Sequence, residues 1–203
     1  MGLHRLAWLH RTTREIVRYE RARPGALLHL DVKKLGRIPL GGGKRFATGF
    51  AETQSGPHSK HSLGVDHLHV AVDDHSRYAY VESLPDERGV TTADFLDRAL
   101  THFQSCGIQV ERILTNNAKN YTSHVFQDVA AAHHITLKRT RPYRPQTNGK
   151  AEAFNKILQN EWAYLRPYTS NVERLEALAP FIAYYNRHRP HGGIDGAVPA
   201  SRL

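Results

Sequence analysis

Apolar and polar residues alternate with a period of two in the early stretches of the chain, and this pattern, together with short apolar runs further along, predicts five β-strands. In the first stretch Leu28, Leu30 and Val32 share one face, while His29 and Asp31 share the opposite face. The predicted strands span residues 27–32, 67–72, 77–84, 110–114 and 135–138. The polar residues between the second and third strands suit a hairpin turn, so we expect these two strands to be antiparallel.

From residue 91 onward, stretches with helical spacing of apolar residues lie between and after the strands. Leu96, Ala99, Leu100 and Phe103 form one apolar stripe, and Gly107 follows it as a stop signal. The predicted helices span residues 91–106, 123–133, 148–165 and 171–186. Three early strands followed by alternating helices and strands predict an α/β fold. We expect a five-stranded mixed sheet flanked by helices, an order that fits a ribonuclease H-like fold.

The polar stretches between these elements carry most of the chain's unbalanced charge. The 203 residues include 28 Lys and Arg against 19 Asp and Glu, a formal net charge of +9. Residues 1–24 hold six of these basic residues and two acids, whereas residues 138–150 hold five basic residues and no acid. Elsewhere the charges cancel. Two basic segments of this kind indicate a polyanionic partner, most often nucleic acid.

Length and composition restrict the remaining possibilities. We interpret residues 1–26 as a basic connector from a missing or truncated N-terminal DNA-binding domain, and residues 27–203 as one core with C-terminal helices. The single cysteine, Cys106, excludes a disulfide framework and a multi-cysteine zinc site. No apolar run approaches the roughly 18 residues of a membrane span, so we expect a soluble protein.

Three polar side chains stand at the ends of predicted elements. Asp31 lies on the first strand, Asn116 follows the fourth, and Glu152 lies in the first turn of a late helix. Hard cations such as Mg²⁺ and Mn²⁺ prefer carboxylate oxygens, and two such ions can support phosphoryl transfer. The alternative interpretation is that Asp31 and Glu152 are ordinary surface acids.

Three longer motifs resemble the integrase core family. Residues 113–121 are similar to its "LTDNG…Y" segment, and residues 139–152 are similar to its "RPYRPQTNGKVE" segment. Between Asn116 and Glu152 lie 35 residues, the spacing of that family's second and third acids. Residues 184–191 resemble the "YN…RPH" signature of bacterial insertion-sequence transposases. The resemblance covers residues 27–203 in order and spacing.

This resemblance implies a DDE-type polynucleotidyl transferase that acts in DNA transposition and integration. Its acids would be Asp31, position 116 and Glu152, which in the family bind two Mg²⁺ or Mn²⁺ ions. The partners implied are the element ends, the target DNA and further copies of the chain in a homodimer or higher multimer. The implied location is the bacterial cytoplasm, in association with the nucleoid.

The sequence departs from the family at the second acid, because Asn116 replaces the aspartate and Ala118 replaces the following glycine. An amide oxygen is neutral, so metal binding and catalysis should be severely impaired. The alternative is a catalytically inert DNA-binding or assembly module. We considered Asp73 as a replacement ligand, but its position before Ser76 and Arg77 favours a role in the turn.

The basic segment and the helix after it contain the candidate DNA contacts. Arginine binds phosphate with a planar fork, and tyrosine can stack on a base or donate a hydrogen bond. The predicted DNA-binding residues are Lys138, Arg139, Arg141, Tyr143, Arg144, Asn148, Lys150, Lys156 and Gln159. A solvated basic face is the alternative. We also predict that Asn148 caps the late helix and that His29 lines the site beside Asp31.

Overall fold

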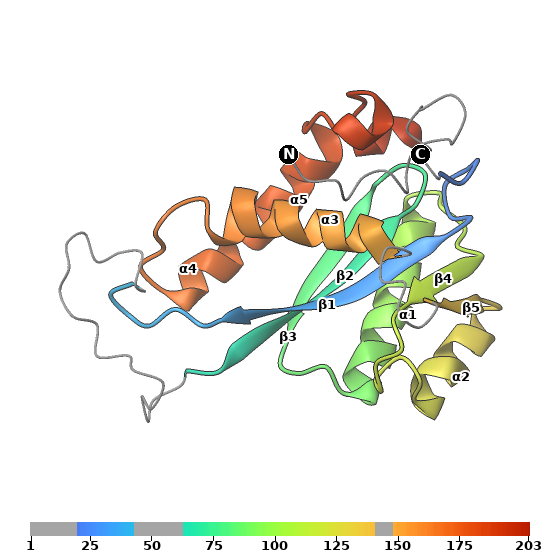
Figure 1. The fold of residues 1–203 in the computed structure, drawn as a ribbon, viewed down its shortest axis with the longest axis horizontal. Helices are drawn as coiled ribbons and strands as arrows, with labels where there is room; N and C mark the ends of the chain where they lie inside the picture. Colours follow the sequence, from blue (N-terminus) through green and yellow to red (C-terminus); the bar gives the residue numbers. More distant parts are fainter. Residues whose placement is uncertain (1–19, 43–62, 141–147) are drawn as a thin grey trace, which may run out of the picture.

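The computed structural model describes residues 20–42, 63–140 and 148–203, and a mixed sheet lies at its centre (Figure 1). Its strand order is β3-β2-β1-β4-β5, which confirms the predicted five-stranded mixed sheet. The first three strands pair antiparallel, whereas β4 and β5 run parallel to β1. The strands are β1 (Leu28–Gly36), β2 (Val65–Asp73), β3 (Ala79–Leu84), β4 (Arg112–Thr115) and β5 (Thr136–Arg139).

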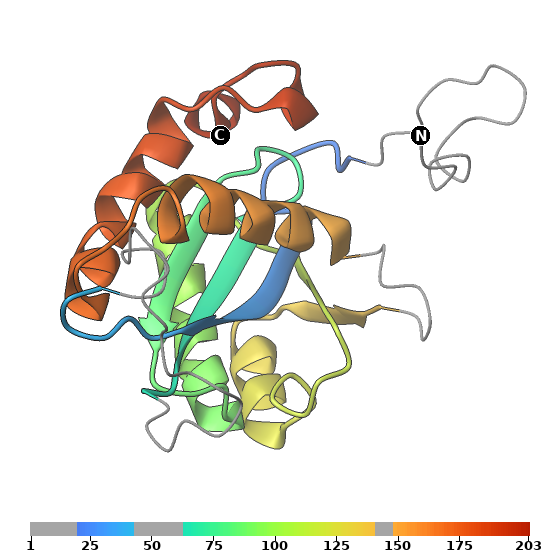
Figure 2. The same ribbon diagram turned by 60° about the vertical axis from the view of Figure 1, so that its left-hand side comes forward.

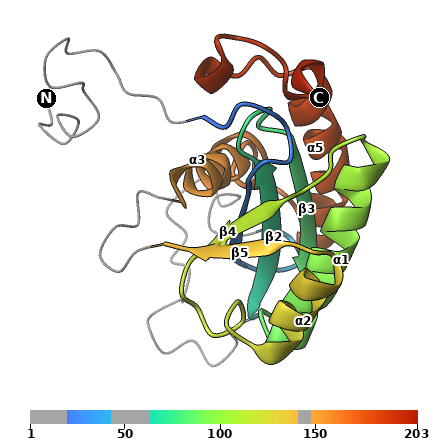
Figure 3. The same ribbon diagram turned by 90° about the vertical axis from the view of Figure 1, so that its right-hand side faces the viewer.

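Helices cover both faces of this sheet (Figure 3). One face packs against α1 (Gly89–Ser105) and α2 (His124–Ala132) through a core that includes Leu28, Leu30 and Phe126. The other face packs against α3 (Gly149–Leu158) and α5 (Leu178–Arg187). Because the side chains of β1 alternate, His29 and Asp31 lie on the α3 face.

The late helices differ from their predicted lengths. The helix expected over 148–165 ends as a π-helical turn, η3 (Gln159–Ala163), and this turn buries Trp162 while Leu165 is exposed. The helix expected over 171–186 is divided at Ala177 into α4 (Asn171–Glu176) and α5. Pro180 explains the division, since it has no N–H for an intrahelical bond and is tolerated only in the first turn of a new helix.

The ends of the described chain meet at one end of the sheet. Gly25 donates its N–H to Asp73 Oδ1 at 2.8 Å, so the segment before β1 is attached to the β2–β3 turn. After α5 come two short 3₁₀ helices that were not predicted, η4 (Gly192–Ile194) and η5 (Pro199–Arg202).

None of the helices in the described ranges has the length and apolarity that a membrane crossing requires.

Candidate functional site

Strand register brings Asp31 and Asn116 to the same place on the sheet. β1 and β4 are parallel neighbours in which Leu28 pairs with Ile113 and His29 pairs with Leu114. Continuing this register past the end of β4 sets Asn116 beside Asp31, on the α3 face. The register thus predicts that the two residues lie close together, although 84 residues separate them in the sequence.

Helix α3 crosses this face of the sheet (Figure 2) and brings Glu152 towards Asp31. Burial raises the pKa of the Asp31 carboxyl above its usual range, and the negative charge of Glu152 raises it further. Glu152 itself is exposed in the first turn of the helix. The site therefore concentrates negative charge, and a bound cation would reduce the repulsion between the two carboxylates.

Asn155 is a site residue that the sequence analysis missed. Its side-chain Nδ2 donates to Asp31 Oδ2 at 2.8 Å, while its buried Oδ1 has no hydrogen-bond partner. Asn155 lies three residues after Glu152, and residues at that spacing share a helix face. This spacing is the signal that could have identified it.

The oxygen atoms of the site fit a hard cation only in part. Asn116 Oδ1 accepts the N–H of Ala118 at 2.9 Å, an ordinary local turn that leaves its second lone pair available. Asp31 and Glu152 are carboxylates, and the buried Oδ1 of Asn155 is a further oxygen without a hydrogen-bond partner. Within the part of the chain that the structure describes, no three histidine, cysteine or acidic side chains are grouped as a metal site requires.

Asp73 stabilises the β2–β3 turn and does not belong to this site. Its Oδ2 accepts hydrogen bonds from the backbone N–H groups of His75 and Ser76 and from the Ser76 hydroxyl. Its Oδ1 accepts the N–H of Gly25. These bonds use both oxygens of a fully buried carboxylate, so the structure gives Asp73 no function as a replacement ligand.

Asn148 and His29 have internal contacts that the sequence analysis did not anticipate. Asn148 is the N-cap residue of α3, but its side chain makes no capping hydrogen bond, so the predicted side-chain cap is wrong. Its Nδ2 instead donates to the Leu30 carbonyl at 3.1 Å, and its Oδ1 lies 3.1 Å from His29 Nδ1. His29 is therefore buried between β1 and the start of α3 rather than open to the site.

Lys150 also points inward. Its Nζ lies 2.6 Å from Asp74 Oδ1 and donates to the Asp74 carbonyl at 3.1 Å. Burial lowers the pKa of Lys150, although the hydrogen bond to Asp74 acts in the opposite direction. One of the five basic residues of segment 138–150 is thus neutralised inside the protein.

The other predicted DNA contacts lie around the site or outside the described residues. Lys138, Arg139 and Lys156 are exposed, and Gln159 is half-buried. Arg141, Tyr143 and Arg144 lie outside the described residues. The chain that leads to them is fixed at Thr140, whose N–H donates to the Thr115 carbonyl and whose carbonyl accepts from Asn117 Nδ2 at 3.0 Å.

Replacing Asp31 with asparagine should stabilise the metal-free protein. A folded-state pKa above the unfolded value means that the ionised carboxylate costs stability at neutral pH, and that this cost disappears as the pH falls through the folded pKa. We expect Asp31→Asn to raise Tm at pH 7 by about 2–4 °C, equivalent to about 1 kcal/mol. The difference should shrink in melts recorded at acidic pH, all in EDTA.

The matched control is Asp73→Asn, which removes a carboxylate that accepts four hydrogen bonds and should lower Tm. A lower Tm for Asp31→Asn at pH 7 would contradict the inference that Asp31 carries uncompensated charge.

Comparison with known proteins gives consistent matches to one family. The profile described as the integrase core domain matches residues 21–145, and a second profile with that description matches residues 133–199. An uncharacterized protein of Caenorhabditis elegans is 32% identical over 134 residues, which are 66% of this chain and 10% of that protein. The chain thus spans about a tenth of the length of this curated relative.

Solved structures share the fold at low sequence identity. The simian T-cell lymphotropic virus intasome, in complex with the PP2A regulatory subunit B56 gamma, aligns with a TM-score of 0.63 and 18% identity over 85% of this chain and 52% of that chain. The HTLV-2 integrase catalytic core domain in complex with magnesium, in its trimeric form, aligns with a TM-score of 0.61 and 16% identity over 89% and 97% of the two chains. The sheet described above therefore has the ribonuclease H-like fold of integrase catalytic cores.

Proposed function

Because this chain belongs to the integrase core domain family, we propose that it is the core of a DDE-type transposase or integrase that cuts and joins DNA strands. One observation carries the proposal: half-buried Asp31 meets the charge of Glu152 on α3, beside the end of β4 where Asn116 follows. The reaction would be attack of water on a phosphodiester to free a 3′-hydroxyl, followed by attack of that hydroxyl on target DNA.

We propose Mg²⁺ or Mn²⁺ as the cofactor, held by the carboxylates of Asp31 and Glu152. When bound, the cation would polarise the phosphodiester and favour the deprotonated attacking oxygen. Asn155 would hold Asp31 in position through the hydrogen bond from its Nδ2. The HTLV-2 core in complex with magnesium supports the identity of the ion. Asn116 would occupy the third ligand position without charge, so binding of two ions should be weak.

The proposed DNA path runs over both sides of this site. Lys138 and Arg139 are exposed at the end of β5, and Lys156 is exposed on α3 one turn after Glu152. Arg141, Tyr143, Arg144 and Gln159 complete the contacts that we propose. Asn148 and Lys150 would act from inside, by holding the start of α3.

The second candidate is an inert DNA-binding or assembly module, and Asn116 is the observation that favours it. Such a chain would bind DNA and other copies of itself without cutting. The dimeric and trimeric forms of the HTLV-2 core support a homodimer or higher multimer for either function. We further propose an origin in a bacterial insertion sequence, a location in the cytoplasm with the nucleoid, and residues 1–26 as a connector to a DNA-reading domain.

Both candidates predict a local DNA-binding surface, which charge-removing variants can test. Each lost phosphate contact should reduce the slope of log affinity against log salt by about 0.9. We expect this reduction for Lys138→Gln and for Arg139→Gln, measured by fluorescence anisotropy with duplex DNA at several salt concentrations.

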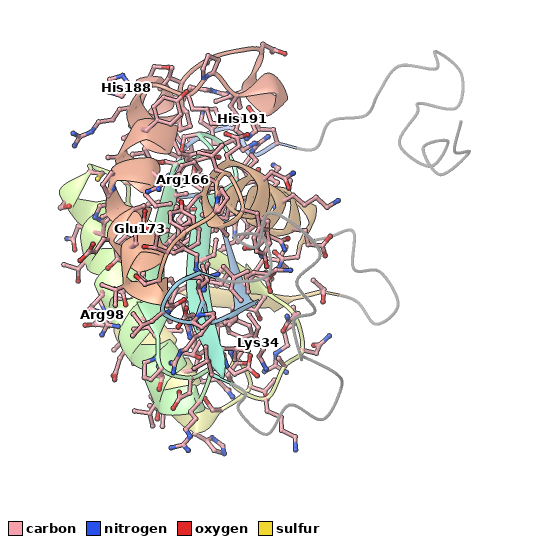
Figure 4. All side chains as sticks on the ribbon, turned by 90° about the vertical axis from the view of Figure 1, so that its left-hand side faces the viewer. Lys34, Arg98, Arg166, Glu173, His188 and His191 are labelled. Carbon is pink, nitrogen blue, oxygen red and sulfur yellow. The ribbon has the colours of Figure 1, made fainter. Side chains whose placement is uncertain are left out.

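The control is Arg98→Gln, which removes the same charge from α1 on the opposite face of the sheet (Figure 4). Its slope should stay at the wild-type value. Equal effects of all three variants would mean that DNA responds only to net charge, and would contradict a binding surface beside the site.

A further inference from the structure

The β2–β3 turn contains a buried carboxylate that the proposed chemistry does not use. Asp74 is 0% exposed, and both of its oxygens are bonded to segments far away in the sequence. Oδ2 accepts the backbone N–H of Arg21 at 2.7 Å. Oδ1 lies 2.7 Å from His29 Nε2 and 2.6 Å from Lys150 Nζ. One side chain thus joins the segment before β1 to the residues around the start of α3.

Hydrogen bonds connect Oδ1 of Asp74 to α3, the proposed catalytic helix. His29 contacts Asp74 with one ring nitrogen and Asn148 with the other. Asn148 is fixed to β1 by its bond to the Leu30 carbonyl and immediately precedes α3. Glu152 follows one turn later, on the same helix. Bonds through His29 and Lys150 therefore connect Asp74 to the first turn of α3, and with it to Glu152.

Oδ2 of Asp74 contacts the segment at residues 20–22, which precedes β1. Arg21 is held at both backbone groups, because its N–H donates to Asp74 and its carbonyl lies 2.8 Å from His75 Nδ1. Glu20, the residue before it, pairs with Arg77 at 3.1 Å and with Arg202 at 2.7 Å. The segment is thus docked on the turn by bonds that do not involve α3, and the side chain of Asp74 bonds both Arg21 and Lys150.

We infer that Asp74 is a positioning residue that couples docking of the segment at residues 20–22 to the placement of the first turn of α3. When the segment is docked, the Arg21 N–H holds one oxygen of Asp74 and fixes the carboxylate for His29 and Lys150. When the segment is displaced, the carboxylate can rotate, and Asn148 and Lys150 lose their fixed partner. This inference rests on the proposed function only in calling α3 the catalytic helix. It predicts that whatever is attached upstream of residue 20 can alter the site without touching it.

A proline substitution can remove the hydrogen bond that joins the segment at residues 20–22 to Asp74. Arg21→Pro deletes the N–H that Asp74 Oδ2 accepts, and Ala22→Pro is the matched control one residue later. We expect hydrogen–deuterium exchange of the backbone amides of 152–156, which donate to the carbonyls of the first turn of α3, to rise about tenfold in Arg21→Pro and to stay unchanged in Ala22→Pro. The full chain is used without metal or DNA.

Variants on the other side of Asp74 test the same route. Lys150→Met and Asp74→Asn should also raise exchange at 152–156, whereas Lys150→Arg, which keeps a cation for Asp74, should restore most of the protection. Amides of β2 at residues 68–72 report global unfolding and should keep their wild-type rates in every variant. Unchanged exchange at 152–156 in Arg21→Pro would overturn the inference, and so would an equal rise in β2.

This experiment is separable from the proposed function. Exchange is measured without cleavage, so an inactive chain would leave the coupling result intact. Conversely, a chain that cuts DNA but shows no response of α3 to Arg21→Pro would retain the proposed function and lose the coupling.

Discussion

Restoring a carboxylate at position 116 is expected to raise metal-dependent DNA cleavage and strand transfer by at least about 100-fold. Changes in residues that merely orient a metal ligand cost about 10–100-fold, and a ligand itself should matter more. Asn116 stands beside Asp31 in the continued register of β1 and β4, so Asn116→Asp would place a third carboxylate opposite Glu152. The measurement is Mn²⁺-dependent nicking and strand transfer on element-end DNA, with the wild type and Asn116→Asp compared at equal concentration.

Two further variants make this comparison specific. Asn117→Asp adds the same charge one residue later, where the native side chain is exposed and bonds the Thr140 carbonyl, and it should not increase activity. Asn116→Asp combined with Glu152→Gln should lose the gain, because a carboxylate is removed again. Equal activity of the wild type and Asn116→Asp would contradict the inference that Asn116 disables the site. Inactivity of every variant would favour the inert module.

Replacing Arg174 with methionine should lower the free energy of unfolding by about 3–5 kcal/mol, because it breaks a buried ion pair on one side. Arg174 is 1% exposed, and its guanidinium reaches Asp66 at 3.0 Å, the Gly36 carbonyl at 2.9 Å and Asn171 Oδ1 at 2.7 Å. These bonds join α4 to the adjoining ends of β1 and β2. Methionine would fill part of the volume but would leave the Asp66 carboxylate with fewer partners.

Chemical denaturation with urea, followed by circular dichroism, measures this loss. Arg98→Met is the control, since Arg98 pairs with Glu82 at 2.6 Å on the solvent side of α1 and should contribute only about 0.2–1 kcal/mol. Adding Asp66→Asn to Arg174→Met should recover part of the loss, because the unpaired charge is removed. Losses of similar size in the two single arginine variants would contradict a structural role for the buried pair.

Most of the fold could be predicted from local patterns. Alternating residues in β1 and β2 identified the strands, and the order of the elements identified the sheet, because strand and helix periods are local properties. The patterns did not reveal the π-helical turn at Gln159–Ala163. That turn depends on Trp162, whose Nε1 donates to the Arg174 carbonyl from α4, and such a tertiary contact leaves no periodic signal.

The candidate site was likewise predictable where linear motifs identify its residues, but not where contacts join residues that are distant in the sequence. Linear motifs pointed to Asp31, Asn116 and Glu152, but they could not separate surface arginines from a lysine that serves as an internal anchor. Lys150 lies within a basic segment, yet its partner Asp74 is 76 residues away in the sequence. Charge counting over residues 138–150 therefore overestimated the surface charge by one. Asn155 was missed because an amide gives no catalytic signal by itself, although its spacing of three residues from Glu152 places both side chains on one face of a helix.

We propose that this chain retains an integrase-type metal site with one carboxylate missing, and Mn²⁺ binding tests this claim without knowledge of the DNA sequence. Isothermal titration calorimetry should be performed on the wild type, Asn116→Asp and Asn116→Asp/Glu152→Gln. We predict that Asn116→Asp binds Mn²⁺ at least about tenfold more tightly than the wild type, because affinity follows the number of charged ligands. The double variant should return to the weak binding of the wild type. Equal Mn²⁺ affinity in all three proteins would contradict the claim.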